Sequence, residues 1–252
     1  MRIILFLAII LSSSSLKASH IVGGEIYYDY LGNNSYRFYI SVYRDCLSNG
    51  AEFDSPLSLG VFSGSNLIQD IQVPFNGSSV VPVIFNNPCV TPPTNICTEH
   101  SLYTAVITLP PSANGYTIAY QRCCRGPNIN NLINPDDTGF TLSCFVPGTS
   151  NNHFINSSPR FIDYPPLLLC NNEDLVFDHS ATDPDGDQLV YSLTTPFSGA
   201  NSINPAPSPP PGPPYNNVIW SNGISPVNPL GGGAAISIDP NTGILTASPN
   251  LL

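Results

Sequence analysis

Three aspartates at alternate positions are the residues best placed to do chemistry: Asp183, Asp185 and Asp187, within ATDPDGDQLVYSL (181–193). Carboxylates this close together, with no neighbouring Lys or Arg, repel one another unless a cation lies between them. Calcium accepts six to eight oxygen ligands in irregular loops, whereas magnesium requires a strict octahedron. The spacing therefore favours a calcium site. The alternative needs no metal, because Asp-Gly between polar and apolar runs is also a strong turn signal.

Tyrosines are the second group of candidate site residues. Tyr27, Tyr39 and Tyr43 lie on the alternate face of an expected hairpin. Aromatic faces stack on sugars, so these residues predict a carbohydrate-binding module; the alternative is that they cover the sheet or belong to a core.

Catalysis is not expected from this sequence. No Gly-x-Ser-x-Gly elbow is present, and the four histidines are scattered without a metalloprotease-type pair. We therefore expect a non-catalytic protein.

Six of the seven cysteines fall in the expected first domain, 19–156: Cys46, Cys89, Cys97, Cys123, Cys124 and Cys144. An even number in an exported protein predicts three disulfides, whose pairing the sequence leaves open; a zinc site is the rival, but no Cys-x-x-Cys spacing supports it. Cys89 and Cys97 bracket a proline-rich loop and are the expected local pair. Cys123 and Cys124 should point to opposite faces of a strand and find different partners. Cys170 either reaches back to the first half or is a free thiol.

Residues 1–18 have the layout of a secretory signal peptide. Arg2 precedes an apolar run, then serines and Ala18, where we expect cleavage; the alternative is a retained N-terminal anchor. Export removes the only lysine, Lys17, and makes a chain of net charge −10 more acidic still. Such a chain is not expected to hold nucleic acid or an anionic lipid surface.

The elements that must position these residues are strands. The composition is rich in Asn, Ser, Thr, Pro, Gly and Tyr and has hardly any helical periodicity, which predicts an all-β protein. Ile26, Tyr28 and Tyr30 alternate before the bend LGNNS, and apolar alternation returns over 36–42, which predicts a hairpin. Further alternating segments suit a β-sandwich and lie at 57–62, 80–85, 102–109, 116–121 and 140–145.

A change of composition over 147–160 predicts a linker between two β-sandwich domains, 19–156 and 157–252. Strands of the second are expected at 167–170, 175–178, 189–194, 217–220, 235–238 and 243–246. The proline-rich segment 205–214 cannot lie inside a sheet. We expect it to form a stiff surface loop, the alternative being a polyproline ligand for a partner.

The acidic turn, its Tyr-Ser-Leu continuation and the later ISIDPNTGILTASPN together resemble a cadherin-like repeat. That resemblance implies an immunoglobulin/cadherin-like sandwich with Asp183, Asp185 and Asp187 as calcium ligands. Asp178 and Asp239 are further candidate ligands, or else solvated loop carboxylates. Such a repeat needs strands beyond Leu252, so the second domain is expected to be incomplete.

Three stretches of the chain are similar, in order, to the N-terminal region of large type IX-secreted surface proteins of gliding bacteria. They are SHIVGGEIYYDY, YRFYISVYRDC and TLPPSANGYTIAYQRCCRGPNINNL. The resemblance implies an exported, outer-membrane-attached, adhesive protein whose calcium-stiffened repeat displays the N-terminal domain. Its implied partners are a surface glycan or protein ligand and further repeats of the same polypeptide. In that family a cysteine often stands where this chain has Thr194, which implies that Cys170 has lost its partner.

Overall fold

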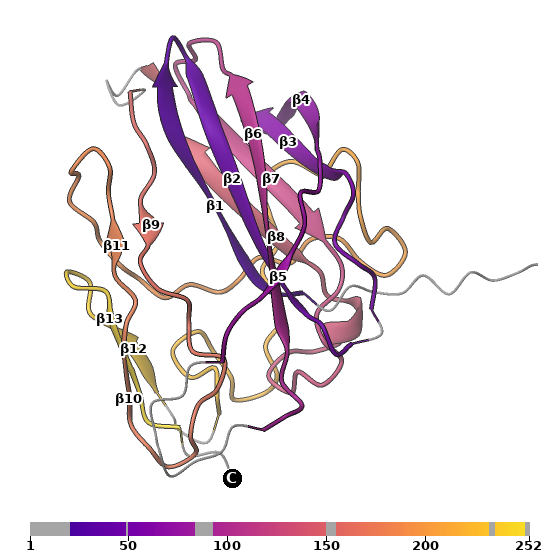
Figure 1. Ribbon diagram of the computed structural model, residues 1–252, viewed down its shortest axis with the longest axis vertical. Helices are drawn as coiled ribbons and strands as arrows, with labels where there is room; N and C mark the ends of the chain where they lie inside the picture. Colours follow the sequence, from indigo (N-terminus) through magenta and orange to yellow (C-terminus); the bar gives the residue numbers. More distant parts are fainter. Residues whose placement is uncertain (1–20, 49, 84–92, 150–154, 232–234, 250–252) are drawn as a thin grey trace, which may run out of the picture.

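The computed structural model of this chain describes most of its residues beyond the expected signal peptide (Figure 1). The described ranges are 21–48, 50–83, 93–149, 155–231 and 235–249. The signal peptide and Cys89 lie outside them. Among the described residues, no helix is long and apolar enough to cross a membrane.

Two four-stranded antiparallel sheets face each other across the main core (Figure 1). The first, called the β1 sheet, has the order β1 (Ile21–Gly32), β2 (Ser35–Asp45), β6 (Thr98–Thr108), β5 (Ser79–Val80). The second, the β3 sheet, has the order β4 (Asn66–Val73), β3 (Leu57–Ser63), β7 (Tyr116–Arg122), β8 (Phe140–Val146). The inward positions of β2 that pack in this core are Tyr36, Phe38, Ile40 and Val42.

The β1–β2 hairpin forms where alternation predicted it. Its turn places Asn33 and Asn34 at φ 51° and 58°, the left-handed conformation that two-residue hairpin turns require and that Asn tolerates. Tyr28 pairs with Phe38 across the hairpin, and both side chains are buried. The residues between the inward ones therefore form the outer face of the β1 sheet.

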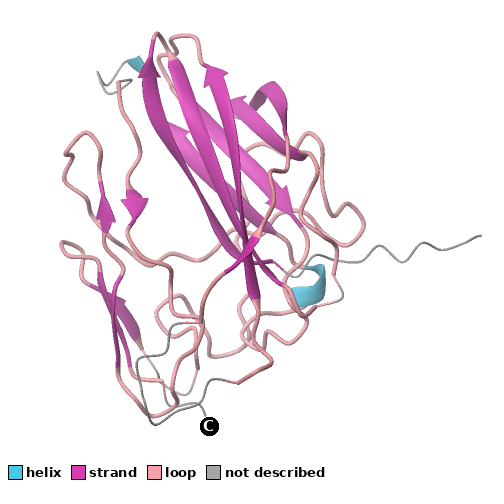
Figure 2. Ribbon diagram, viewed as in Figure 1, coloured by secondary structure: helices cyan, strands magenta, loops and turns pink. Residues whose placement is uncertain are grey.

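The remaining strands form a second, smaller group. β10 (Leu175–Asp178), β13 (Ile244–Ala247) and β12 (Ile236–Ile238) make a three-stranded antiparallel sheet, and β9 (Arg160–Phe161) pairs with β11 (Ala181–Thr182). Figure 2 shows that loops join these short strands. Elsewhere in the chain, a 3₁₀ helix, η1 (Pro135–Asp137), lies before β8. The expectation of an all-β protein is confirmed. The likeness to a cadherin repeat and the boundary at 156/157 stay predictions.

Two expected strands of this group are wrong. Residues 167–170 and 189–194 pair with no strand in the described structure. Tyr191 instead anchors the second segment, because its backbone N–H bonds to Pro240 O at 3.0 Å and its hydroxyl accepts a hydrogen bond from the Ala181 N–H at 2.9 Å. Residues 217–220 contribute only isolated bridges, to Phe197 and Leu132. Strand β4 was missed because most of its residues are exposed.

The proline-rich segment is a cover for the β3 sheet. It lies outside any sheet, as expected, and Pro207 and Pro210 are buried. The Cys123 N–H donates to Pro205 O at 2.8 Å, and Gln121 Nε2 donates to Pro211 O at 3.5 Å. The segment also lies against β3, since a Cβ on Gly60 would be 2.9 Å from Pro210 Cγ and one on Gly212 would be 2.8 Å from the Phe62 ring. Nearly every residue of β3 is accordingly buried, on both faces of the strand.

One disulfide joins Cys46 to Cys97, with Cα atoms 5.3 Å apart. The expected Cys89–Cys97 pair is wrong, because β2 and β6 are neighbours and Asp45 lies opposite Thr98, which brings the flanking cysteines together. Cys89 itself is outside the described residues.

Cys123 and Cys124 form a disulfide with each other, and the peptide bond between them is cis. The expectation of separate partners is wrong, since β7 ends at Arg122 and the alternation of a strand no longer applies. Cys144 and Cys170 are free thiols, so the expected place of Cys144 in a disulfide is wrong as well. Burial raises the pKa of the Cys144 thiol and keeps it protonated.

Candidate functional site

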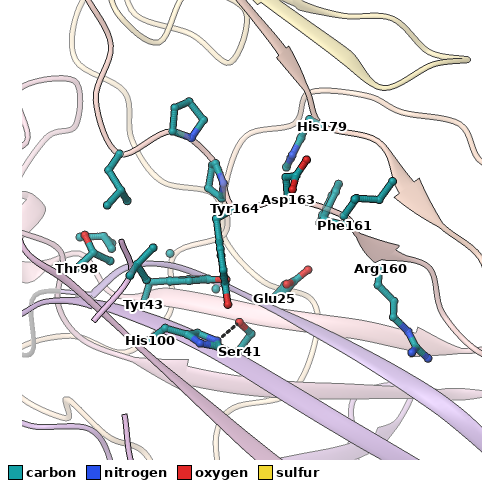
Figure 3. Close-up of a pocket in the computed structure, with 18 of the residues that line it drawn as sticks. Glu25, Ser41, Tyr43, Thr98, His100, Arg160, Phe161, Asp163, Tyr164 and His179 are labelled. Atoms are coloured by element: carbon teal, nitrogen blue, oxygen red, sulfur yellow. Dashed lines mark hydrogen bonds between the residues drawn. The ribbon is translucent and has the colours of Figure 1, made fainter. Parts of the chain in front are cut away.

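A cleft of about 780 Å³ lies between the outer face of the β1 sheet and the segment 160–167 (Figure 3). Strands β1, β2 and β6 form its floor. Its wall consists of the segment 160–167 together with His179. The cleft contains two of the three tyrosines singled out in the sequence, Tyr27 and Tyr43.

The register of the β1 sheet sets the pattern of the floor. Gly23 lies opposite Tyr43, which lies opposite His100; the next outward row is Glu25, Ser41 and Leu102. The rings of Tyr43 and His100 stack with centroids 4.8 Å apart. A Cβ on Gly23 would meet no heavy atom within 4 Å, so this glycine leaves open space in front of Tyr43.

Tyr27 and Tyr39 form the neighbouring row and stack on each other at 4.8 Å. The Tyr39 hydroxyl donates to Asp29 at 3.1 Å. Arg160 lies over the Tyr27 ring, 5.6 Å from its centroid, and forms an ion pair with Asp29. The guanidinium is thus engaged by the protein itself, and Tyr39 supports Tyr27 without being part of the cleft lining.

The wall is positioned by contacts to the edge of β1 and to β11. Ser158 N–H donates to Tyr28 O at 2.9 Å, Tyr28 N–H donates to Ser158 Oγ at 2.7 Å, and the Ile162 N–H bonds to Ser180 O. Tyr164 then meets Tyr43 edge to face at 6.0 Å. The two rings make an aromatic corner, visible in Figure 3 above His100.

Burial sets the charge of the floor. It lowers the pKa of His100, whose Nε2 lies 2.8 Å from Ser41 Oγ, so the imidazole is neutral at neutral pH. It also raises the pKa of Tyr43 to about 12 and keeps that hydroxyl protonated. Desolvation raises the pKa of the half-buried Glu25 carboxyl, which makes no hydrogen bond or ion pair with any described residue.

Ser41 and His100 have the contact of a nucleophile with a base, but catalysis of that kind also needs a group that orients the base. No described carboxylate bonds to His100. The arrangement is suited to holding a ligand by aromatic contact and hydrogen bonding.

The acidic turn lies outside this cleft. Asp183 Oδ1 accepts the backbone N–H groups of Asp185 and Asp187 at 2.9 and 3.1 Å, and Gly186 has φ 79°. This is the hydrogen bonding of an Asx-type turn. Asp185 Oδ2 accepts the Ser157 N–H, and the Asp187 side chain is exposed.

Asp178 and Asp239 also cap backbone turns. Asp178 accepts the Ser180 N–H at 3.0 Å, and Asp239 accepts those of Asn241 and Thr242; these hydrogen bonds lower the pKa of both carboxyls. Over the part of the chain that the structure describes, no three His, Cys, Asp or Glu side chains converge as a metal site. The described arrangement does not fit calcium, which stays a prediction of the sequence.

The sequence analysis missed several residues that the cleft uses, among them Glu25, Ser41, His100 and Tyr164. The first carried a usable signal, because it lies two residues before Tyr27 on the same strand face. Tyr164 carried none, since only the fold brings it to Tyr43.

Comparison of the chain with protein-family models, with curated proteins and with solved structures found no match.

Proposed function

We propose that this chain is a non-catalytic, exported surface protein that binds a saccharide in the aromatic cleft of its β1 sheet. One observation carries the proposal: Tyr27 and Tyr43 line a single open cleft in which Ser41 and Glu25 lie between them as hydrogen-bonding groups. Sugars present both an apolar C–H face and hydroxyls. A site that alternates rings with hydroxyl and carboxylate oxygens suits both surfaces.

The aromatic corner strengthens this assignment. Tyr164 is 52% exposed and stands edge-on to Tyr43, so a ligand entering the cleft meets rings from both the floor and the wall. Tyr43 itself is held by its stack on His100, and a ring already fixed in place loses little conformational freedom on binding.

Export and surface display are supported by the sequence of residues 1–18, by the resemblance to gliding-bacterial surface proteins and by the Cys46–Cys97 disulfide, which favours an oxidising compartment. Adhesion through a displayed saccharide-binding domain follows from these properties together. The calcium-stiffened repeat is not needed for saccharide binding in this cleft.

A glycan array on the oxidised protein, followed by calorimetry on the best ligand, tests the proposal. We expect Tyr43→Ala to weaken binding by about tenfold. Gly23→Leu should abolish it, because the side chain enters the open space in front of Tyr43. Phe145→Ala is the matched control, since this exposed ring lies on β8, outside the cleft. No saccharide binding, or equal loss in all three variants, would contradict the proposal.

A further inference from the structure

Glu25 is the charged side chain of the cleft floor, and nothing in the described protein neutralises it. It is half-buried and makes no hydrogen bond or ion pair with a described residue. A carboxylate removed from water without a partner is costly, and proteins pair such groups or use them. The open space beside Glu25 is where a partner could enter.

Tyrosine side chains lie near this carboxylate in the cleft. Tyr27 follows it two residues along β1, and Tyr43 lies diagonally across on β2. The charge of Glu25 acts on both phenols and helps to raise their pKa, and Tyr164 acts on the same two rings. Three tyrosines and Glu25 therefore line the same cleft. Figure 3 shows Glu25, Tyr43 and Tyr164 in it.

The basic groups of the cleft do not neutralise the Glu25 carboxylate. Arg160 is paired with Asp29, and burial lowers the pKa of both His100 and His179, so neither imidazole supplies a positive charge at neutral pH. Arg160 also shows what these rings attract, because its guanidinium lies over Tyr27 at cation–π distance.

We propose that the cleft recognises a positively charged amino group, carried by an amino sugar and held between Glu25 and the rings of Tyr27, Tyr43 and Tyr164. A carboxylate inside an aromatic cage binds an ammonium ion through the charge pair and through the ring faces together. This inference rests on the proposed saccharide binding and names its ligand class. Chitosan-type oligosaccharides, with free 2-amino groups, are the probe, and chitin-type oligosaccharides, with the same backbone N-acetylated, are the neutral counterpart.

Calorimetry of the oxidised protein with both oligosaccharides, matched in length, tests the inference. We expect the free-amino series to bind at least about tenfold more tightly than the acetylated series. Glu25→Gln, which keeps the shape and removes the charge, should abolish this preference and leave the acetylated series unchanged. Glu173→Gln is the matched control, because it makes the same change at an exposed position outside the cleft.

Three results would overturn the inference, and they separate it from the proposed function. If both series bind equally and Glu25→Gln has no effect, the cleft binds saccharides but does not recognise the amino group. Binding of a lysine-rich peptide but of neither oligosaccharide assigns the cage to a protein partner. Binding of no saccharide and no peptide removes both proposals.

Discussion

The backbone N–H of Ser157 donates a 2.5 Å hydrogen bond to Asp185 Oδ2, across 28 positions of the chain. Ser157 Oγ in turn accepts the Tyr30 N–H at 3.2 Å, so the acidic turn is linked through one residue to the edge of β1. The same segment continues to Arg160 and Tyr164 in the wall of the cleft. Asp185 thus helps to position the wall without lining the cleft.

Replacing Asp183, Asp185 and Asp187 together by Asn tests the role of the acidic turn. Asn retains a side-chain carbonyl that accepts the same backbone hydrogen bonds. We therefore expect the triple variant to melt close to wild type in chelator, as measured by thermal unfolding.

The calcium prediction is decided in the same melts. A ligand at about a hundred times its dissociation constant adds roughly 2.7 kcal/mol to the stability of the state that it binds. A rise of the wild-type Tm in millimolar calcium that the triple variant lacks would establish calcium binding. A triple variant that is strongly destabilised in chelator would instead contradict the view that the side chains serve only as backbone acceptors.

Glu25→Gln should stabilise the protein at neutral pH, in the absence of ligand. Because desolvation raises the pKa of Glu25 above the 4.5 of an exposed glutamate, folding favours the protonated form. The stability contributed by that protonation is complete below 4.5 and is lost as the pH rises through the raised pKa. The Tm of the variant should therefore exceed that of wild type at about pH 7 and approach it at about pH 4. A pH-independent difference would contradict the assignment of a desolvated carboxylate.

Loss of the Cys46–Cys97 disulfide should destabilise the sandwich. The bond closes a loop with a sequence separation of 51, for which chain entropy gives a stabilisation of about 4 kcal/mol. We expect the Cys46→Ala, Cys97→Ala double variant to lower the free energy of unfolding by that order in urea titrations. A change of less than about 1 kcal/mol would show that the unfolded state is already restricted.

Gly60→Ala tests the contact between β3 and the proline-rich cover. A Cβ on Gly60 would lie 2.5 Å from the Phe62 ring and 2.9 Å from Pro210 Cγ, so the cover or the ring must shift. We expect a loss of about 1–3 kcal/mol in urea unfolding. Gly126→Ala is the control, because nothing lies within 4 Å of its Cβ, and it should be nearly neutral. If Gly60→Ala and Gly126→Ala changed the stability equally, the proline-rich segment would not pack against β3 at Gly60.

Local pattern predicted the hairpin and the direction of its side chains. Alternation depends only on neighbouring residues, so Tyr28 and Phe38 could be placed inward and Tyr27, Tyr39 and Tyr43 outward from the sequence. The same reasoning failed at 189–194, where the residues alternate as in a strand but the described structure offers no strand to pair with.

The sequence by itself determined the all-β class and the outward tyrosine face, because each depends on residues close together in the chain. It offered the backbone turn at Asp183, Asp185 and Asp187 only as the alternative to a calcium site. Tertiary structure alone decided the pairing of Cys46 with Cys97, the use of the prolines as a cover and the meeting of Tyr164 with Tyr43. These contacts join segments far apart in sequence, and their positions depend on sheet register and on the path of the loops. The candidate site belongs to this second kind: its floor follows from alternation, and its wall follows only from the fold.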